Sequence, residues 1–199
     1  MKELILVAQE TTVYGKDLYG KKSLHILLKK LCEIRGIRWI RILYCYPEEI
    51  YDELIETIRD EKKICHYLDI PIQHASDRIL KRMGRRTSKQ ELIDIVGKLR
   101  KEIPDIVLRT TLITGFPGET EEDHEELKEF VDEMEFDRLG VFTYSPEENT
   151  PAAEMADQVP EEVKEERRGE LMELQQEISY DRGQDRIGQE LLVMIERKK

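Results

Sequence analysis

The sequence contains no apolar run close to the roughly 20 residues that a helix needs to cross a bilayer. It also shows no secretory signal, because Met1-Lys-Glu leads directly into the strand-like residues 4–7. The net charge of -11 argues against a general nucleic-acid coat protein. We therefore expect a soluble, cytoplasmic protein without a membrane partner.

Cysteine is scarce and scattered along the chain. The three cysteines, Cys32, Cys45 and Cys65, lie 13 and 20 residues apart, whereas zinc and iron–sulfur sites use close pairs. Cysteines spaced in this way are usually buried thiols. We therefore predict no metal site in these residues. An evident Ser-His-Asp or Cys-His arrangement for nucleophilic catalysis is missing too.

The sequence does contain a regular alternation of strand and helix patterns. Apolar, β-branched runs predict five strands, at residues 2–9, 39–44, 66–72, 108–114 and 139–144. Amphipathic helices follow them, with predicted starts at Ser23, Pro47, Ser76, Ser88, Thr120 and Pro160. Such alternation gives a parallel sheet with right-handed crossovers. A closed eight-unit barrel takes about 250 residues, so we expect either a doubly wound sheet or part of a barrel.

The end of the chain differs from the rest. The helix that begins at Pro160 is highly charged, and its narrow apolar stripe is interrupted by Arg167. This pattern predicts a helix on the surface. Gly188 ends the helix, and residues 191–195 predict a sixth strand.

Polar residues gather where the predicted strands end, which is where α/β folds bind ligands. The set includes Gln9, Asp69, Gln73, Arg109 and the turn that begins at Gly115. It supplies hydrogen-bonding groups and an arginine suited to a carboxylate or phosphate. Structural interpretations stay open, because Gln9 could cap a strand and Asp69 could pair with a neighbour. Arg109 must be ion-paired or face a polar interior, because an unpaired buried charge is costly.

Charge is distributed unevenly. Residues 119–135 carry ten acidic side chains and one lysine, whereas residues 78–89 carry six basic side chains and no acid. We interpret both runs as solvated helix faces. The alternative for the basic run is contact with nucleic-acid phosphates.

Five stretches match a known family in order along nearly the whole chain. They are Ala8-Gln-Glu-Thr-Thr-Val-Tyr-Gly15, Tyr44-Cys-Tyr-Pro47, Leu68-Asp-Ile-Pro-Ile-Gln-His-Ala-Ser-Asp-Arg78, Gly115-Phe-Pro-Gly-Glu-Thr120 and Phe142-Thr-Tyr-Ser-Pro-Glu-Glu148. The sequence thereby resembles the radical S-adenosylmethionine methylthiotransferases. The likeness is greatest to the type that methylthiolates an aspartate β-carbon in the twelfth protein of the small ribosomal subunit. The sister type, which modifies a tRNA adenosine, is the alternative.

The resemblance implies a fold and its cofactors. Residues 1–187 would form a partial, open parallel β/α barrel of about five units that lacks its first strand and cluster loop. Residues 188–199 would begin a small, truncated C-terminal β domain. The full-length enzymes use S-adenosylmethionine and two 4Fe-4S clusters. This sequence has no Cys-x-x-x-Cys-x-x-Cys loop, so we expect the fragment to hold no cluster and to be inactive alone.

The resemblance also implies an S-adenosylmethionine site, with contributions from Gln9, Asp69, Gln73, Arg109, Gly115, Phe142 and Tyr144. Gln9 would contact the amino group and Arg109 the carboxylate. Asp69 and Gln73 would lie near the ribose. The Gly115 turn would shape the adenine pocket, with the two aromatic residues packed nearby. The pattern Gly-x-Ile-x-Gly-x-x-Glu, which is general among radical enzymes of this kind, is only partly present. Thr111 stands in place of the first glycine, and Glu119 lies one residue after the position of the glutamate in the pattern.

The implied partner is the ribosomal protein of the small subunit. Ribosomal RNA is a further partner to consider, through Arg78, Arg82, Arg85 and Arg86. Two other functional classes stay open. One is a non-radical α/β enzyme that holds a phosphate at the Gly115–Gly118 turn, and the other is a non-catalytic module that docks on the ribosome.

Overall fold

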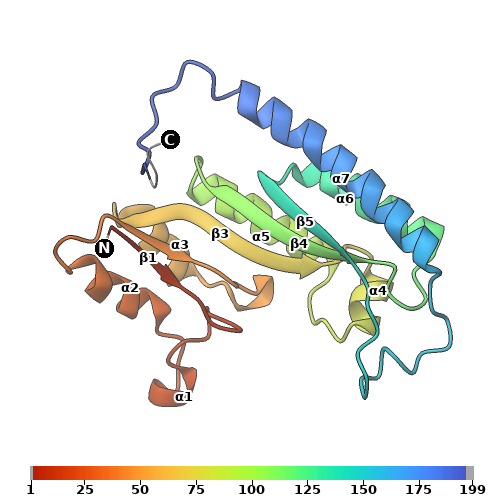
Figure 1. Cartoon of the computed structure of the whole chain (residues 1–199). Helices are drawn as coiled ribbons and strands as arrows, with labels where there is room; N and C mark the ends of the chain where they lie inside the picture. Colours follow the sequence, from red (N-terminus) through yellow and green to blue (C-terminus); the bar gives the residue numbers. More distant parts are fainter. Residues whose placement is uncertain (1, 196–199) are drawn as a thin grey trace.

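The computed structural model describes residues 2–195 and shows one sheet with helices packed on it (Figure 1). The strands are β1 (Glu3–Leu6), β2 (Trp39–Ile42), β3 (Ile64–Gln73), β4 (Val107–Thr114) and β5 (Arg138–Thr143). They pair in parallel in the order β1-β2-β3-β4-β5, so β1 and β5 are the two edges of an open sheet. The prediction of an open, parallel β/α array is confirmed.

The helices connect the strands and cover the sheet. They are α1 (Lys16–Tyr19), α2 (Leu24–Cys32), the 3-10 turn η1 (Pro47–Glu49), α3 (Asp52–Asp60), α4 (Asp77–Arg82), α5 (Lys89–Glu102), α6 (Glu121–Met134) and α7 (Glu161–Gln184). In Figure 1, α3, α5 and α6 lie behind the sheet, and α7 runs along its β5 edge. No helix within residues 2–195 is long and apolar enough to cross a membrane.

The core lies between the sheet and these helices. Along β4 the even-numbered residues, Leu108 to Thr114, are buried, whereas the odd-numbered residues are half-buried. This period of two is expected when helices cover one face of a strand. The helices supply buried side chains such as Leu28, Ile55, Val96, Leu127 and Phe130. The other face of the sheet, called the open face below, carries the odd-numbered residues of β4.

Two helices begin with the local chemistry that the sequence predicts. The hydroxyl of Ser88 accepts a hydrogen bond from the amide of Glu91, whose carboxylate in turn accepts one from the amide of Ser88. Thr120 and Asp123 make the same reciprocal pair at the start of α6. Each pair satisfies backbone donors that a helix start leaves free, which is typically worth about 1 kcal/mol.

Two predicted strands differ from the structure. The predicted buried strand at 2–9 is only four residues long, and Ile5 is 49% exposed, because β1 is an edge strand. Residues 191–195 form no strand, and Leu192 is 85% exposed. A strand needs a hydrogen-bonded neighbour, and this segment pairs with none of the strands in the described residues. The proposed domain boundary at residue 188 stays a prediction.

Candidate functional site

Asp69 and Arg109 form an ion pair on the open face of the sheet. They are register partners on β3 and β4, and Nη1 of Arg109 lies 2.6 Å from Oδ1 of Asp69. The Asp69 side chain is almost fully buried, whereas 38% of the Arg109 side chain is exposed. Of the two alternatives that the sequence left for Arg109, ion pairing is the one observed, and the partner is the neighbouring Asp69. Because a guanidinium has five N–H donors, Arg109 keeps donors for a ligand.

Two residues at the carboxyl end of the sheet have an unusual backbone conformation. Tyr44, after β2, has φ of 58°, and Gln73, the last residue of β3, has φ of 73°. Such conformations cost a non-glycine residue about 1–3 kcal/mol and concentrate at functional sites. The side-chain oxygen of Gln73 is buried and finds no hydrogen-bond partner within residues 2–195. A buried acceptor without a partner is unusual, and it makes the end of β3 a candidate part of a binding site.

The loop after β1 holds Gln9, and Glu10 fixes its shape. Gln9 is exposed and lies in a bend. The Glu10 carboxylate accepts hydrogen bonds from the amides of Thr12 at 2.8 Å and Tyr46 at 2.9 Å. Burial raises the pKa of Glu10 above its ordinary value, although the two amides oppose this. The loops that follow β1 and β2 are thereby tied together beside Gln9.

The turn after β4 is closed from inside by Glu119. The Glu119 carboxylate accepts hydrogen bonds from the amides of Gly115 at 2.8 Å and Phe116 at 3.2 Å, and from the hydroxyl of Thr114 at 3.2 Å. These amides are the donors that a phosphate would need. Because an internal carboxylate already occupies them, the alternative of a phosphate site at Gly115–Gly118 is not supported.

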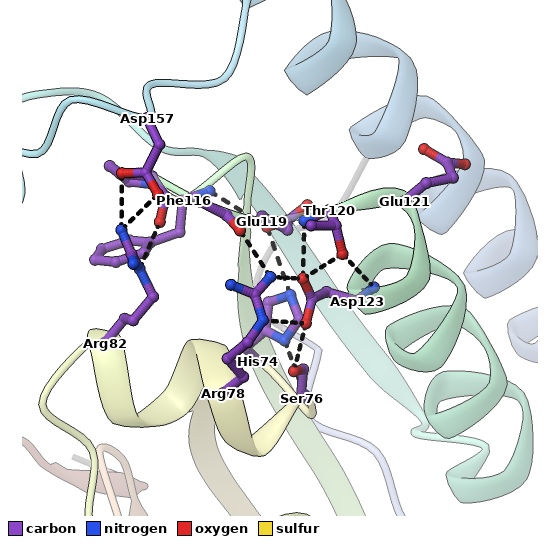
Figure 2. A network of polar contacts seen from close by, with 12 residues as sticks. His74, Ser76, Arg78, Arg82, Phe116, Glu119, Thr120, Glu121, Asp123 and Asp157 are labelled. Atoms are coloured by element: carbon purple, nitrogen blue, oxygen red, sulfur yellow. Dashed lines mark hydrogen bonds and ion pairs between the residues drawn. The ribbon is translucent and has the colours of Figure 1, made fainter.

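The outer side of the same turn is held by α4 (Figure 2). Arg78 donates a hydrogen bond to the carbonyl of Gly118 at 2.7 Å and is ion-paired with Asp123. Arg82 donates to the carbonyl of Pro117 at 3.0 Å and pairs with Asp157. The basic run is therefore not simply a solvated face, since these two guanidinium groups clamp the turn.

Arg85 is engaged within the chain as well. Its guanidinium donates a hydrogen bond to the carbonyl of Pro71 at 2.6 Å and lies 4.7 Å from the centre of the Tyr46 ring. Three of the four arginines considered for RNA contact thus hold loops of the chain itself. Contact with RNA stays a prediction. Fewer arginines of the basic run are available for it, because three of them already bind groups of the chain itself.

The two aromatic candidates lie in different environments. Phe142 is 59% exposed on β5 and is the register partner of Ile113. Tyr144 is buried, and its ring packs edge-on against Phe116 at 5.2 Å between ring centres. The Tyr144 hydroxyl is buried without a hydrogen-bond partner in the described chain. Phe142 is therefore available to a ligand, whereas Tyr144 supports the turn from beneath.

Comparison with known proteins identifies the family. Residues 2–131, well over half of the chain, match the Radical SAM superfamily. The chain belongs to this superfamily. Over its whole length it is 70% identical to the ribosomal protein uS12 methylthiotransferase RimO of Lachnoclostridium phytofermentans, and it covers 45% of that protein. It is 57% identical to the RimO of Clostridium perfringens strain 13, of which it covers 44%.

Solved structures share the fold, among them one named as a radical SAM enzyme. Coproporphyrinogen III oxidase (HemN) of Escherichia coli aligns with 77% of this chain at a TM-score of 0.62 and 21% identity, over 36% of its own length. The Elp3 protein of Methanocaldococcus infernus aligns with 85% at a TM-score of 0.60 and 15% identity, over 44% of its own length. The resemblance to methylthiotransferases and the partial barrel are both confirmed. The chain spans under half the length of the curated relatives named above.

Radical SAM chemistry uses S-adenosylmethionine with a 4Fe-4S cluster. The open face fits the first of these, because it offers spare donors on Arg109 and an exposed ring on Phe142. At the carboxyl end of β3, the buried amide oxygen of Gln73 has no hydrogen-bond partner within residues 2–195. The cysteines of the described chain are free thiols, with Cys45 buried and the other two half-buried. No cluster of three or more His, Cys, Asp or Glu side chains arranged to hold a metal occurs within residues 2–195.

Two buried charged residues support the turn after β4, and the prediction from the sequence did not indicate their role. Glu119 was noted only as a displaced motif residue, and Arg167 only as an interruption of an apolar stripe. In the structure their side chains are buried and ion-paired at 2.9 Å. A signal was available, because Lys164, Arg167 and Gln175 recur at helical spacing with Leu171 and Ile178.

Proposed function

We propose that this chain belongs to the radical domain of a methylthiotransferase that adds a methylthio group to an aspartate β-carbon of ribosomal protein uS12. One observation carries the proposal: the chain is 70% identical over its whole length to a protein named as a uS12 methylthiotransferase. Membership of the radical SAM superfamily supports the same chemistry. Because the chain covers 45% of that relative, the activity is proposed for the complete protein that contains it.

We assign the open face and its carboxyl end to S-adenosylmethionine. Gln9 would contact the amino group, Asp69 and Gln73 the ribose, and Arg109 the carboxylate. Gln73 is the register partner of Leu112, which lies three residues after Arg109 on β4, a separation of roughly 10 Å at about 3.3 Å per residue. A ligand that contacts both Gln73 and Arg109 must therefore extend down the open face.

The adenine would be bounded by the Gly115 turn and the exposed ring of Phe142, with Tyr144 beneath the turn. When bound, S-adenosylmethionine and the reduced cluster supply the hydrogen-abstracting chemistry. The residues of this chain bind and orient the cofactor. Arg109 fixes one end, and the ion pair with Asp69 keeps its guanidinium pointing along the sheet.

Several further assignments belong to the complete protein. It would carry two 4Fe-4S clusters, with the ligands for both outside these 199 residues, and this chain alone would be inactive. It would act in the cytoplasm on uS12. Contact with ribosomal RNA would rest mainly on Arg86, because three other arginines of the basic run are engaged within the chain.

The test is methylthiolation of uS12 by the complete, cluster-reconstituted protein, followed by mass spectrometry of the peptide that carries the aspartate. A methylthio adduct that depends on S-adenosylmethionine is expected. The same reaction with tRNA tests the sister activity. Modification of tRNA with unmodified uS12 would overturn the proposed substrate, and no modification of either would overturn the activity.

A further inference from the structure

Helix α7 directs two buried basic side chains at the loops that follow β4 and β5. Lys164 and Arg167 are three residues apart, so they lie on the same face of the helix. Their side chains are only 5% and 7% exposed. Long basic side chains are rarely buried unless they are paired. Arg167 pairs with Glu119 and also with the exposed Glu121. Lys164 pairs with the exposed Glu161 of α7 itself and donates to the carbonyl of Tyr144. Of these partners, Glu119 and Tyr144 belong to the loops that follow β4 and β5.

Arg167 holds the turn through Glu119. Its Nη1 lies 2.9 Å from Oε1 of Glu119 and also donates a hydrogen bond to the Glu119 carbonyl at 3.3 Å. The other oxygen of the same carboxylate accepts from the amides of Gly115 and Phe116. A chain of direct contacts therefore runs from α7 through one carboxylate to the backbone of the turn.

His74 approaches the same carboxylate from the end of β3. Its Nδ1 accepts a hydrogen bond from the amide of Ser76 at 2.9 Å, so the proton of the neutral ring lies on Nε2. This Nε2 is 3.5 Å from Oε2 of Glu119. The fully buried Glu119 side chain is thus held by the arginine behind the turn, with the histidine close by but making no hydrogen bond to it within residues 2–195.

Lys164 supports the turn and the next loop together. Its Nζ donates a hydrogen bond to the carbonyl of Tyr144 at 2.9 Å. Its methylene chain occupies the space in which a Cβ on Gly115 would lie, and Gly115 has φ of 71°. The side chain therefore packs directly against the backbone that turns the chain after β4.

We propose that Arg167 and Lys164 are positioning residues, which hold the Gly115–Phe116 turn in the conformation that binds the nucleoside part of S-adenosylmethionine. The inference rests on the proposed function. Neither side chain would touch the cofactor, because Arg167 acts through Glu119, and Lys164 acts through Gly115 and the Tyr144 carbonyl. Without Arg167 the buried Glu119 charge loses its ion-pair partner at 2.9 Å, which is unfavourable. The carboxylate would then protonate or move, and the two amides would lose their acceptor.

The test compares Arg167→Gln with Arg168→Gln in the complete, cluster-reconstituted protein. Arg168 is the next residue on α7 and forms an exposed pair with Glu165, so it is a matched control. Affinity for S-adenosylmethionine is measured by calorimetry well below the melting temperature of each variant. Arg167→Gln should weaken binding on the order of tenfold, as for other groups that orient a binding residue indirectly. Arg168→Gln should bind like the wild type.

Two further measurements separate positioning from general destabilisation. Hydrogen exchange should report faster exchange at the amides of Gly115 and Phe116 in Arg167→Gln, with unchanged exchange in β2. Arg167→Lys keeps a donor for Glu119 and should restore part of the affinity. Lys164→Met keeps the packing against Gly115 while removing the hydrogen bond to Tyr144, and should weaken binding less than Arg167→Gln.

The outcomes distinguish the inference from the function on which it rests. Wild-type protein that fails to bind S-adenosylmethionine would overturn the proposed function, and the positioning role with it. Binding that is the same in the wild type and in Arg167→Gln would overturn the positioning role alone. Unchanged exchange at Gly115 and Phe116 in that variant would do so too.

Discussion

Asp69 and Arg109 lie directly opposite each other on neighbouring parallel strands, and their ion pair is open to solvent on one side only. The carboxylate is buried against the sheet, whereas more than a third of the guanidinium side chain is exposed. An arginine fixed in this way presents its remaining donors in one direction. On the open face of a radical SAM domain, that direction is where we assign the cofactor.

The first prediction concerns this pair. Arg109→Ala in the complete protein should weaken binding of S-adenosylmethionine, since it removes the donors proposed for the carboxylate. Asp69→Asn should weaken it less, because the amide oxygen can still accept from the guanidinium. Calorimetric titration measures both. Arg59→Ala is the control, because Arg59 forms only exposed pairs on α3 and α5, and unchanged affinity in Arg109→Ala would refute the assigned role.

The second prediction concerns Gly115. Gly115→Ala places a Cβ where the Lys164 side chain lies, on a backbone with φ of 71°. Positive φ and overpacking each cost about 1–3 kcal/mol, so the free energy of unfolding should fall by at least about 1 kcal/mol. Gly97→Ala on α5 meets no atom within 4 Å and should stabilise the protein by about 0.5–1 kcal/mol. Denaturant unfolding of both variants measures the difference, and equal effects would contradict the packing.

The third prediction separates the two aromatic candidates. Phe142→Ala removes a ring that is 59% exposed, so stability should change by less than about 1 kcal/mol while affinity for S-adenosylmethionine falls. Tyr144→Phe removes a buried hydroxyl without a partner in the described chain and should leave both unchanged or raise stability slightly. A Phe142→Ala variant with full affinity would remove this residue from the site.

The sequence predicted the order of strands and helices well because local signals agreed along most of the chain. Around β4 and α6, a β-branched run, a turn with two glycines and a capping threonine specify strand, turn and helix in succession. The rule that ligands bind where parallel strands end drew attention to the polar site residues, but Arg109 is the third residue of β4 and Asp69 lies inside β3. That rule does not predict how far a residue lies from the end of its strand. It also does not predict which residues face each other, such as Asp69 and Arg109, which the strand register shows.

Long-range polar contacts could not be predicted in the same way. Arg167 pairs with Glu119, 48 residues earlier in the chain, and no local pattern connects the two. The narrow apolar stripe correctly placed α7 on the surface, with Leu171 and Ile178 against the core. It did not indicate that Lys164, Arg167 and Gln175 are buried on the same face. The basic run was likewise interpreted as solvated. The carbonyls that accept from it, those of Pro71 in β3 and of Pro117 and Gly118 in the turn after β4, are distant in the sequence from the arginines or belong to another element.

The last prediction follows from the state of Glu119. Burial alone would raise the pKa of this carboxyl, but the contact with His74, the charge of Arg167 and the amide of Phe116 outweigh it. The pKa in the folded protein is therefore below the ordinary 4.5. Unfolded chains then bind more protons than folded ones in acid. The stability that Glu119 contributes is present above pH 4.5 and is lost as the pH falls through the folded value.

Chemical unfolding between pH 6 and about pH 3 measures this contribution. The free energy of unfolding should fall with pH more steeply in the wild type than in Glu119→Gln, which cannot lose a charge in this range. Glu165→Gln is the control, because it removes an exposed carboxylate and should follow the wild-type slope. Asp123, whose pKa is also held well below its usual range because Arg78 outweighs burial, adds to the slope in all three proteins. Parallel curves for the wild type and Glu119→Gln would mean that Glu119 is not held as a charged group beneath the turn.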